Sequence, residues 1–213
     1  GQVIAGDVLG QITAAVLGAE VVVTPVSSNT GAEAGGKFAR VIRTKIGSPF
    51  VIAAMEAAGG RVVGYEANGG FLLGFDAQGP AGPLPALMTR DSLLPLVAVL
   101  AEAHKVGGLP ALLARQPARF TAADRLEETP PEATGPLLAG LIAGPDPLLL
   151  AISETESARD LTDGLRLILA SGRVLHLRPS GNAPEFRIYA EAESAAAAAR
   201  LLARARGWLA TQF

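Results

Sequence analysis

The sequence has 213 residues, of which 49% are hydrophobic and 18% are charged, and its formal net charge is −2. A chain this apolar can bury enough surface to offset the entropy of ordering, which excludes a disordered linker. The balanced charge excludes a broad basic surface for nucleic acid, the lack of cysteine excludes disulfides, and no apolar run approaches the roughly 20 residues of a membrane-spanning helix. We therefore expect a cytoplasmic protein with no nucleic-acid or membrane partner.

The first residues have the pattern of one strand of a hairpin whose partner strand is missing. This segment, residues 2–6, is not a signal peptide, because no basic stretch followed by an apolar one occurs there. It is not preceded by an initiator methionine. We therefore expect the sequence to be an excised piece of a longer protein.

The first half predicts helices that alternate with strands, in a βαβ order typical of an α/β domain. Asp7 and Ser48 are predicted helix N-caps, and Thr30 with Glu33 forms a predicted capping box. The predicted elements are a helix at 7–17, a buried strand at 21–23, a short helix from 30, a strand at 40–44, a helix at 48–58, strands at 61–65 and 71–75, a glycine- and proline-rich loop at 76–85, and helices at 91–104 and 109–115.

The second half predicts a different architecture. Charges and prolines without periodicity mark residues 116–131 as a junction, and we place two domains at 1–116 and 117–213. The predicted elements beyond the junction are a helix at 132–143, a strand at 148–153, a hairpin of 165–169 with 174–177, a strand at 186–191 and a helix at 194–209. Helices on one face of an antiparallel sheet make an α+β domain.

The loop at residues 178–184, Arg-Pro-Ser-Gly-Asn-Ala-Pro, is the strongest candidate for a binding site. The backbone N–H groups of Ser180, Gly181 and Asn182 can form an anion-binding nest, and the serine hydroxyl is a further donor. Arg178 can add a bidentate contact to a phosphate, and the two prolines restrict the loop. The alternative interpretation is an ordinary turn with a solvated arginine.

Two loops in the first half are further candidates. Glu66 can accept hydrogen bonds from two neighbouring hydroxyls and the Asn68 amide can both donate and accept, so this loop suits a polyol such as a sugar ring. The alternative is a Gly-Gly hairpin with an exposed glutamate. At residues 43–48 a strand meets a helix N-terminus, where free N–H groups, Arg43 and Lys45 favour an anion.

Other kinds of site have little support in the sequence. The two histidines, His104 and His176, lack partners at metal-ligand spacing, and we expect structural or surface roles for both. No Ser/His/Asp arrangement, nucleophile elbow or Walker loop occurs.

The three candidate loops, in this order, resemble the third and fourth domains of the α-D-phosphohexomutases, the superfamily of phosphomannomutases and phosphoglucomutases. Residues 178–184 resemble its phosphate-binding motif Arg-Pro-Ser-Gly-Thr-Glu-Pro, residues 66–69 its sugar-binding Glu-x-Ser-Gly loop, and residues 44–47 a Thr-Lys-x-Gly segment at the active cleft. Asn182 and Asn68 depart from the pattern but keep its hydrogen-bonding capacity, whereas Ala183 and Gly70 do not replace the usual glutamate and histidine. These departures leave the preferred sugar open.

The resemblance implies a mixed-sheet α/β domain followed by a smaller domain, similar to the TATA-binding protein, with an antiparallel sheet covered on one face by helices. It also implies phosphate binding by Arg178, Ser180, Gly181 and Asn182, sugar binding by Glu66 and Asn68, and a place near the reacting phosphate for Lys45.

The parent of such a piece would interconvert hexose 1-phosphate and hexose 6-phosphate through a hexose 1,6-bisphosphate. The resemblance implies that its phosphoserine and its Mg²⁺ loop lie in the missing N-terminal domains, and neither motif occurs in these 213 residues. We therefore assign no catalytic or metal-binding residue here and expect this piece alone to be inactive. Two alternatives stay open, namely a non-catalytic sugar-phosphate-binding module and a fragment of an amino-sugar phosphate mutase.

Overall fold

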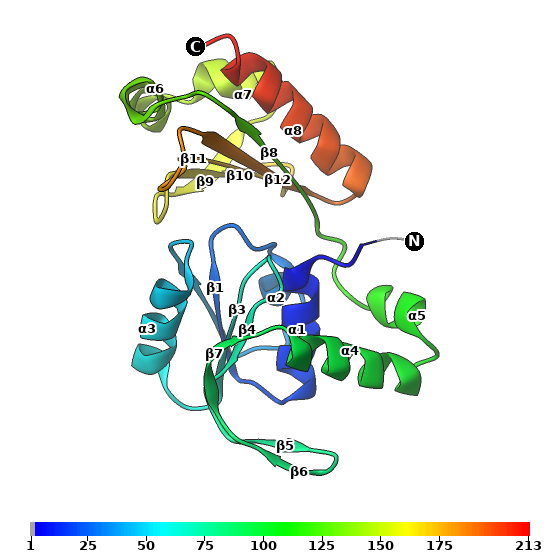
Figure 1. Ribbon diagram of the computed structural model, residues 1–213. Helices are drawn as coiled ribbons and strands as arrows, with labels where there is room; N and C mark the ends of the chain where they lie inside the picture. The colour runs from blue at the N-terminus through cyan, green and yellow to red at the C-terminus, as the bar shows by residue number, and fades with distance from the viewer. Residues whose placement is uncertain (1–2) are drawn as a thin grey trace. The chain divides into compact units, whose positions relative to one another are not determined.

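The computed structural model describes residues 3–213 and consists of two compact units, unit 1 (Gly1–Pro117) and unit 2 (Ala118–Phe213) (Figure 1). Of the strand predicted at 2–6, residue 2 lies outside the described residues, and residues 3–5 form no strand. Each unit has its own sheet and its own hydrophobic core.

Unit 1 is built on a five-stranded mixed sheet in the order β2-β1-β3-β4-β7. Its strands are β1 (Val21–Pro25), β2 (Arg40–Thr44), β3 (Val62–Tyr65), β4 (Phe71–Leu73) and β7 (Leu87–Asp91), and β5 (Ala77–Gly79) and β6 (Gly82–Leu84) form a separate hairpin. β1 runs parallel to β2 and β3, whereas β4 is antiparallel to β3 and to β7. The helices are α1 (Gly6–Val16), α2 (Gly31–Ala34), α3 (Ser48–Ala58), α4 (Leu93–Lys105) and α5 (Leu109–Leu113).

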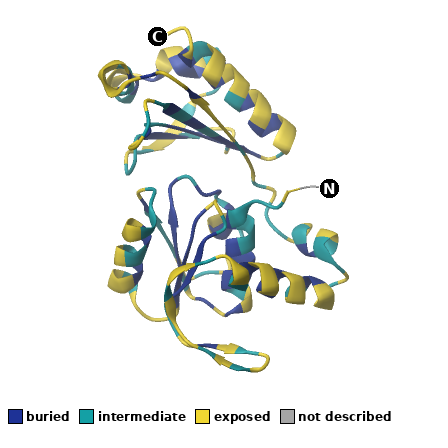
Figure 2. Cartoon of the chain, in the orientation of Figure 1, coloured by how far each residue is buried: buried dark blue, intermediate teal, exposed yellow. Residues whose placement is uncertain are grey.

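Helices cover both faces of the unit 1 sheet. Val22 of β1 packs in one cluster with Ala14 of α1, while Val23 packs in another with Met55 of α3. Successive side chains of a strand point to opposite faces, so a run of consecutive valines is buried on both sides. Figure 2 shows β1 and β3 in the colour of buried residues, whereas α3 and α4 carry many exposed residues.

Unit 2 is built on a five-stranded antiparallel sheet in the order β8-β12-β11-β10-β9. Its elements are β8 (Phe120–Leu126), α6 (Pro131–Ala143), α7 (Asp146–Ile152), β9 (Glu156–Asp160), β10 (Leu165–Leu169), β11 (Val174–Pro179), β12 (Phe186–Ala192) and α8 (Ala195–Leu209). Leu167 and Leu177 pack in one core with Leu201 and Leu209 of α8. This arrangement and the unit 1 sheet confirm the predicted fold class.

The predicted strand at 148–153 is wrong, because these residues belong mostly to helix α7. Pro147 lies in the first turn of the helix, where a missing N–H costs no hydrogen bond. Leu148, Leu149 and Ile152 are buried, at a spacing that fits one face of a helix. A short run of leucines fits a strand equally well by pattern, and only the packing against the rest of unit 2 decides between them.

Five strands were not predicted. One of them, β9, lies between the segment predicted as a strand at 148–153 and the predicted hairpin. β8 lies inside the predicted junction, and β5, β6 and β7 lie in or beside the predicted loop at 76–85. Most side chains of β8 and β7 are exposed or half-exposed, so no alternation of buried and exposed residues marks these strands.

The predicted side-chain caps in unit 1 are also wrong. The N-caps of α1, α2 and α3 are Ala5, Thr30 and Gly47, and none makes a side-chain capping bond. The carboxylate of Asp7 instead accepts a hydrogen bond from the Asn29 backbone N–H at 2.8 Å, and the Ser48 hydroxyl donates to Glu66. Both side chains connect separate segments of the chain rather than cap a helix.

Among residues 3–213, no single helix is long and apolar enough to cross a bilayer. Only α6 and α7 taken together reach that length and composition, and they are bent by 87°.

His176 is a buried polar residue on β11, with 1% of its surface exposed. Its ring stacks on Tyr189 with the centroids 5.3 Å apart, and its Nε2 lies 2.6 Å from the Asp163 carbonyl oxygen. Because the carbonyl can only accept, Nε2 carries the proton of the neutral ring. Burial lowers the pKa of His176 to about 4.

The contact between Gly10 of α1 and the ring of Tyr65 leads to a first prediction. Replacing a helical glycine with alanine normally stabilises a protein by up to about 1 kcal/mol. A Cβ at Gly10 would lie 2.4 Å from Tyr65 Cγ, whereas one at Gly207 of α8 would meet nothing within 4 Å. We expect Gly10→Ala to lower the free energy of unfolding by about 1–3 kcal/mol and Gly207→Ala to raise it. Urea unfolding of both variants tests this, and stabilisation by Gly10→Ala would contradict the close contact.

The low pKa of His176 leads to a second prediction. The unfolded chain takes up a proton at this histidine near pH 6.5, and the folded chain does so only near pH 4, so stability falls as pH drops through that window. The loss reaches about 3 kcal/mol at most. His176→Gln keeps a donor for the Asp163 carbonyl but does not titrate. The difference in unfolding free energy between wild type and variant should therefore shrink from pH 7 to pH 4, and a constant difference would refute the assignment.

Candidate functional site

The loop after β3, residues 66–70, is the sugar loop predicted from the sequence. The Glu66 N–H donates to the Gly70 carbonyl and the Gly69 N–H donates to the Glu66 carbonyl, both at 3.0 Å. Gly69 has a φ of 92°, which side-chain-bearing residues rarely adopt. These bonds close a tight turn that presents two polar side chains.

The Glu66 carboxylate is buried, with 7% of the residue exposed, and it is held by two neighbours. The Ser48 hydroxyl donates to Oε1 at 2.5 Å, and the Asn68 amide donates to Oε2 at 3.2 Å. A carboxylate has about four acceptor positions, so Glu66 keeps capacity for ligand hydroxyls. Asn68 is exposed, and its Oδ1 accepts from the Gly70 N–H at 3.0 Å.

Ser48, predicted as a helix cap at the end of the 43–48 segment, is instead a hydrogen-bond partner of the candidate sugar residue Glu66. It lies 18 positions before Glu66, at the start of α3, and the two segments follow β2 and β3. Because both strands run parallel to β1, their carboxyl ends meet at one edge of the sheet, where open α/β sheets bind ligands. The position of this serine, directly after a strand and a glycine, was the sequence feature that could have indicated its role.

The two cations of the 43–48 segment have different environments. Arg43 donates to the backbone carbonyls of Ser28 and Asn29, each at 2.7 Å, and pairs with Glu33 at 2.8 Å. It therefore stabilises the chain after β1 and is not available to an anion, in contrast to the expectation. Lys45 is exposed and has no ion-pair partner within residues 3–213, and its Nζ lies 6.0 Å from the centroid of the Phe50 ring.

The first turn of α1 packs against the backbone of the sugar loop. A Cβ at Gly6 would lie 2.2 Å from the Gly69 nitrogen and 2.6 Å from the Ala67 carbonyl oxygen, so only glycine fits against this backbone. Next to it, burial raises the pKa of Asp7, although its carboxylate accepts hydrogen bonds from the backbone of Asn29. The helix start and the sugar loop are thus in direct contact.

The loop at 178–184 in unit 2 connects β11 to β12 and is the predicted phosphate loop. The Ser180 N–H donates to the Glu185 carbonyl at 2.8 Å, so it is not part of an anion-binding nest, contrary to the sequence-based expectation. The Ser180 hydroxyl donates to Asn182 Oδ1 at 2.9 Å. Nothing in the described part of the chain accepts from the N–H groups of Gly181 and Asn182, which lie exposed.

Arg178 is largely buried, with 13% of its side chain exposed. Its Nε lies 3.4 Å from Asp163 Oδ1, which is an ion pair but too long for a hydrogen bond, and Nε has no other partner in residues 3–213. The guanidinium therefore keeps donors that a bound anion could use, together with the two backbone N–H groups of the loop.

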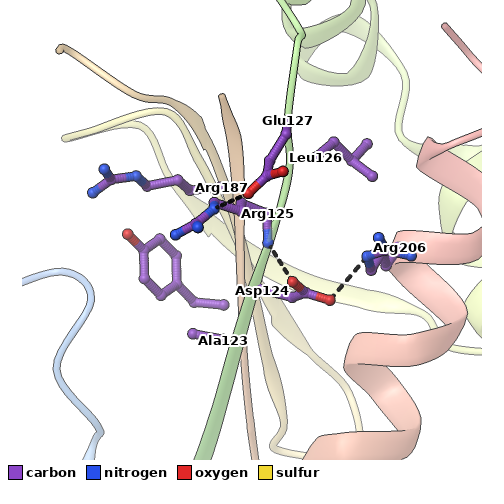
Figure 3. Close-up of a pocket in the computed structure, with 8 residues that line it drawn as sticks. Ala123, Asp124, Arg125, Leu126, Glu127, Arg187 and Arg206 are labelled. Carbon is purple, nitrogen blue, oxygen red and sulfur yellow. Dashed lines mark hydrogen bonds and ion pairs between the residues drawn. The ribbon is translucent and has the colours of Figure 1, made fainter. Parts of the chain in front are cut away.

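A cavity of about 850 Å³ lies beside edge strand β8 in unit 2 (Figure 3). It is lined by Ala123, Asp124, Arg125, Leu126, Glu127, Arg187, Tyr189 and Arg206. Arg125 pairs with Glu127 at 3.0 Å, and Arg206 pairs with Asp124 at 2.8 Å. None of the predicted site residues lines this cavity, and its charged side chains are ion-paired, with Arg187 paired to Glu185 outside the lining. The phosphate loop is therefore the better candidate for an anion site.

The residues present do not fit the Mg²⁺ that the resemblance implies. Within residues 3–213, no group of three or more His, Cys, Asp or Glu side chains could hold a metal ion. We therefore derive no step through a metal for this chain.

Comparison with known proteins assigns both units to the same family. Residues 3–120 match the family model "Phosphoglucomutase/phosphomannomutase, alpha/beta/alpha domain III", and residues 143–207 match "Phosphoglucomutase/phosphomannomutase, C-terminal domain". A phosphomannomutase of Sinorhizobium fredii is 42% identical over 207 residues, covering 93% of this chain and 43% of the relative. A phosphomannomutase of Salmonella muenchen is 39% identical over 195 residues, covering 89% and 41%. The chain thus spans less than half the length of these relatives.

Solved structures share the fold. A phosphoglucomutase/phosphomannomutase family protein of Burkholderia thailandensis matches with a TM-score of 0.70 and 21% identity, covering 100% of this chain and 43% of that one. An N-acetylphosphoglucosamine mutase of Aspergillus fumigatus matches with a TM-score of 0.65 and 18% identity, covering 99% and 44%. That Aspergillus enzyme has been solved with GlcNAc-6P and magnesium. The family model that matches unit 1 covers more than half of the chain, and we conclude that the chain belongs to the phosphoglucomutase/phosphomannomutase family.

Proposed function

We propose that this chain is the sugar- and phosphate-binding part of a phosphohexomutase that interconverts mannose 1-phosphate and mannose 6-phosphate. The single observation that carries the proposal is the largely buried Arg178, whose guanidinium has no hydrogen-bond partner among residues 3–213 and belongs to the same loop as the exposed N–H groups of Gly181 and Asn182. The name of the two curated relatives supports mannose as the sugar. Amino-sugar phosphates are the second candidate class, supported by fold likeness alone.

In this proposal, residues 117–213 hold the phosphate that is not transferred. Arg178 supplies a bidentate contact and the N–H groups of Gly181 and Asn182 supply further donors, while the Ser180 hydroxyl holds the Asn182 side chain and would donate to phosphate only after leaving it. A site of this kind needs no broad basic surface, which agrees with a net charge of −2.

Residues 1–116 hold the sugar and lie near the reacting phosphate. Glu66 accepts from two sugar hydroxyls, Asn68 contributes its amide, and the exposed Lys45 neutralises charge on the phosphate being transferred. The rest of the parent would supply the phosphoserine and the Mg²⁺, so that a hexose 1,6-bisphosphate forms as the intermediate. The chain alone would bind hexose phosphate in the cytoplasm without turning it over.

The role of Arg178 can be tested with a matched variant. Removing a charge-assisted contact to phosphate costs about 1.5–3 kcal/mol, so Arg178→Ala should weaken binding of mannose 1-phosphate by about tenfold or more. Arg200→Ala removes the same charge from an exposed position of α8 and should leave binding unchanged. Calorimetric titration of the 213-residue chain measures both. Equal weakening by the two variants would mean that only net charge matters, and titration with glucosamine 1-phosphate tests the second candidate class.

The contact between Gly6 and the sugar loop leads to a separate prediction. Gly6→Ala forces the loop backbone to move, so binding of mannose 1-phosphate should weaken several-fold while binding of inorganic phosphate, held by unit 2, stays the same. Gly140→Ala, in open space on α6, is the control for general effects of the substitution. Parallel titrations with the two ligands provide the comparison. A loss that is equal for both ligands would contradict a role confined to the sugar loop.

A further inference from the structure

We propose that the turn between β9 and β10, residues 162–164, is a positioning device for Arg178 that reserves the two Nη atoms of its guanidinium for phosphate. The inference rests on the proposed function, because it assigns a partner to the arginine of the phosphate loop. Asp163 is the positioning residue, and Gly164 sets its distance from β11.

The backbone of this turn lies directly against the backbone of Arg178. Gly164 has a φ of 85°, and a Cβ there would lie 2.3 Å from the Leu177 carbonyl oxygen and 2.8 Å from Arg178 Cβ. A side chain at this position would push the turn away from β11. Glycine therefore allows the turn to approach the arginine more closely than any other residue could.

Two further contacts hold the turn in that place. The Nε2 of His176, two residues before Arg178 on the same face of the sheet, lies 2.6 Å from the Asp163 carbonyl oxygen. On the other side, the Thr162 N–H donates to Asp160 Oδ1 at 2.8 Å. The position of Asp163 is thus fixed relative to β11 by contacts that do not involve its carboxylate.

The Asp163 carboxylate faces one particular edge of the guanidinium. Its Oδ1 lies 3.4 Å from Arg178 Nε. A guanidinium can bind a phosphate through Nε and one Nη or through both Nη atoms. A carboxylate at Nε occupies the first of these edges and leaves the second, with its two parallel N–H donors, for the ligand.

Charge and geometry make opposite predictions for this aspartate. As a negative charge beside the site, Asp163 repels a phosphate, so its removal would strengthen anion binding if the field alone mattered. As an ion-pair partner of Arg178, Asp163 reduces the number of orientations that the arginine side chain samples, so removal of the carboxylate would weaken binding. The sign of the change in affinity distinguishes the two roles.

The experiment is titration of the 213-residue chain with inorganic phosphate, followed by calorimetry and by the NMR signal of the Arg178 Nε–H group. We expect Asp163→Asn to weaken phosphate binding about three- to tenfold and to shift the Nε–H signal. Asp124→Asn removes one carboxylate of the same unit, which pairs with Arg206 of α8 and not with Arg178, and it should bind phosphate no more weakly than wild type. Unchanged or tighter binding by Asp163→Asn overturns the inference.

A second variant addresses the turn without changing any charge. Gly164→Ala should also weaken phosphate binding. In the double variant, Asp163→Asn should add a smaller loss than it causes alone, because both changes disturb the same contact. If Gly164→Ala does not fold, Asp163→Asn still decides the matter. Failure of Arg178→Ala to weaken phosphate binding would instead refute the proposed function itself, and the positioning role with it.

Discussion

The parallel arrangement of β1, β2 and β3 is the constraint on which the candidate sugar site depends. Parallel strands bring their carboxyl ends to one edge of the sheet, so the segments that follow β2 and β3 meet there although the chain between them forms a whole helix. This constraint puts the Ser48 hydroxyl 2.5 Å from Glu66. Helices on both faces bury the strands, which gives the edge a rigid base.

Close backbone approach, made possible by glycine, is the second recurring feature. Gly6 lets the start of α1 contact the sugar loop, Gly10 lets the same helix lie on the Tyr65 ring, and Gly164 lets a turn of unit 2 lie on Arg178. Each contact joins segments that are distant in sequence. In all three, the absent side chain allows the backbone to lie closer to its neighbour than any other residue would permit.

Periodic segments of the fold could be predicted from the sequence. Packing does not override the patterns of three such segments. They are helix α3 with its terminating glycine, the valines of β1 and the hairpin of β10 with β11. The misassigned segments lack such patterns. The leucine run of α7 fits a helix or a strand, and β8 has mostly exposed side chains, so its identity depends on pairing with β12.

The sequence by itself determined the family, the three candidate loops and the residue types that suit phosphate and sugar, because motifs are local in the chain. Only the tertiary structure decided how those side chains are held. It showed that Arg43 is engaged by carbonyls and that the Ser180 N–H is used within its own loop. It also showed that Ser48 holds Glu66 and that Asp163 faces Arg178. Apart from the bond within the Ser180 loop, these partners are well separated in sequence, and hydrogen bonds and ion pairs depend on distances that only strand register and packing establish.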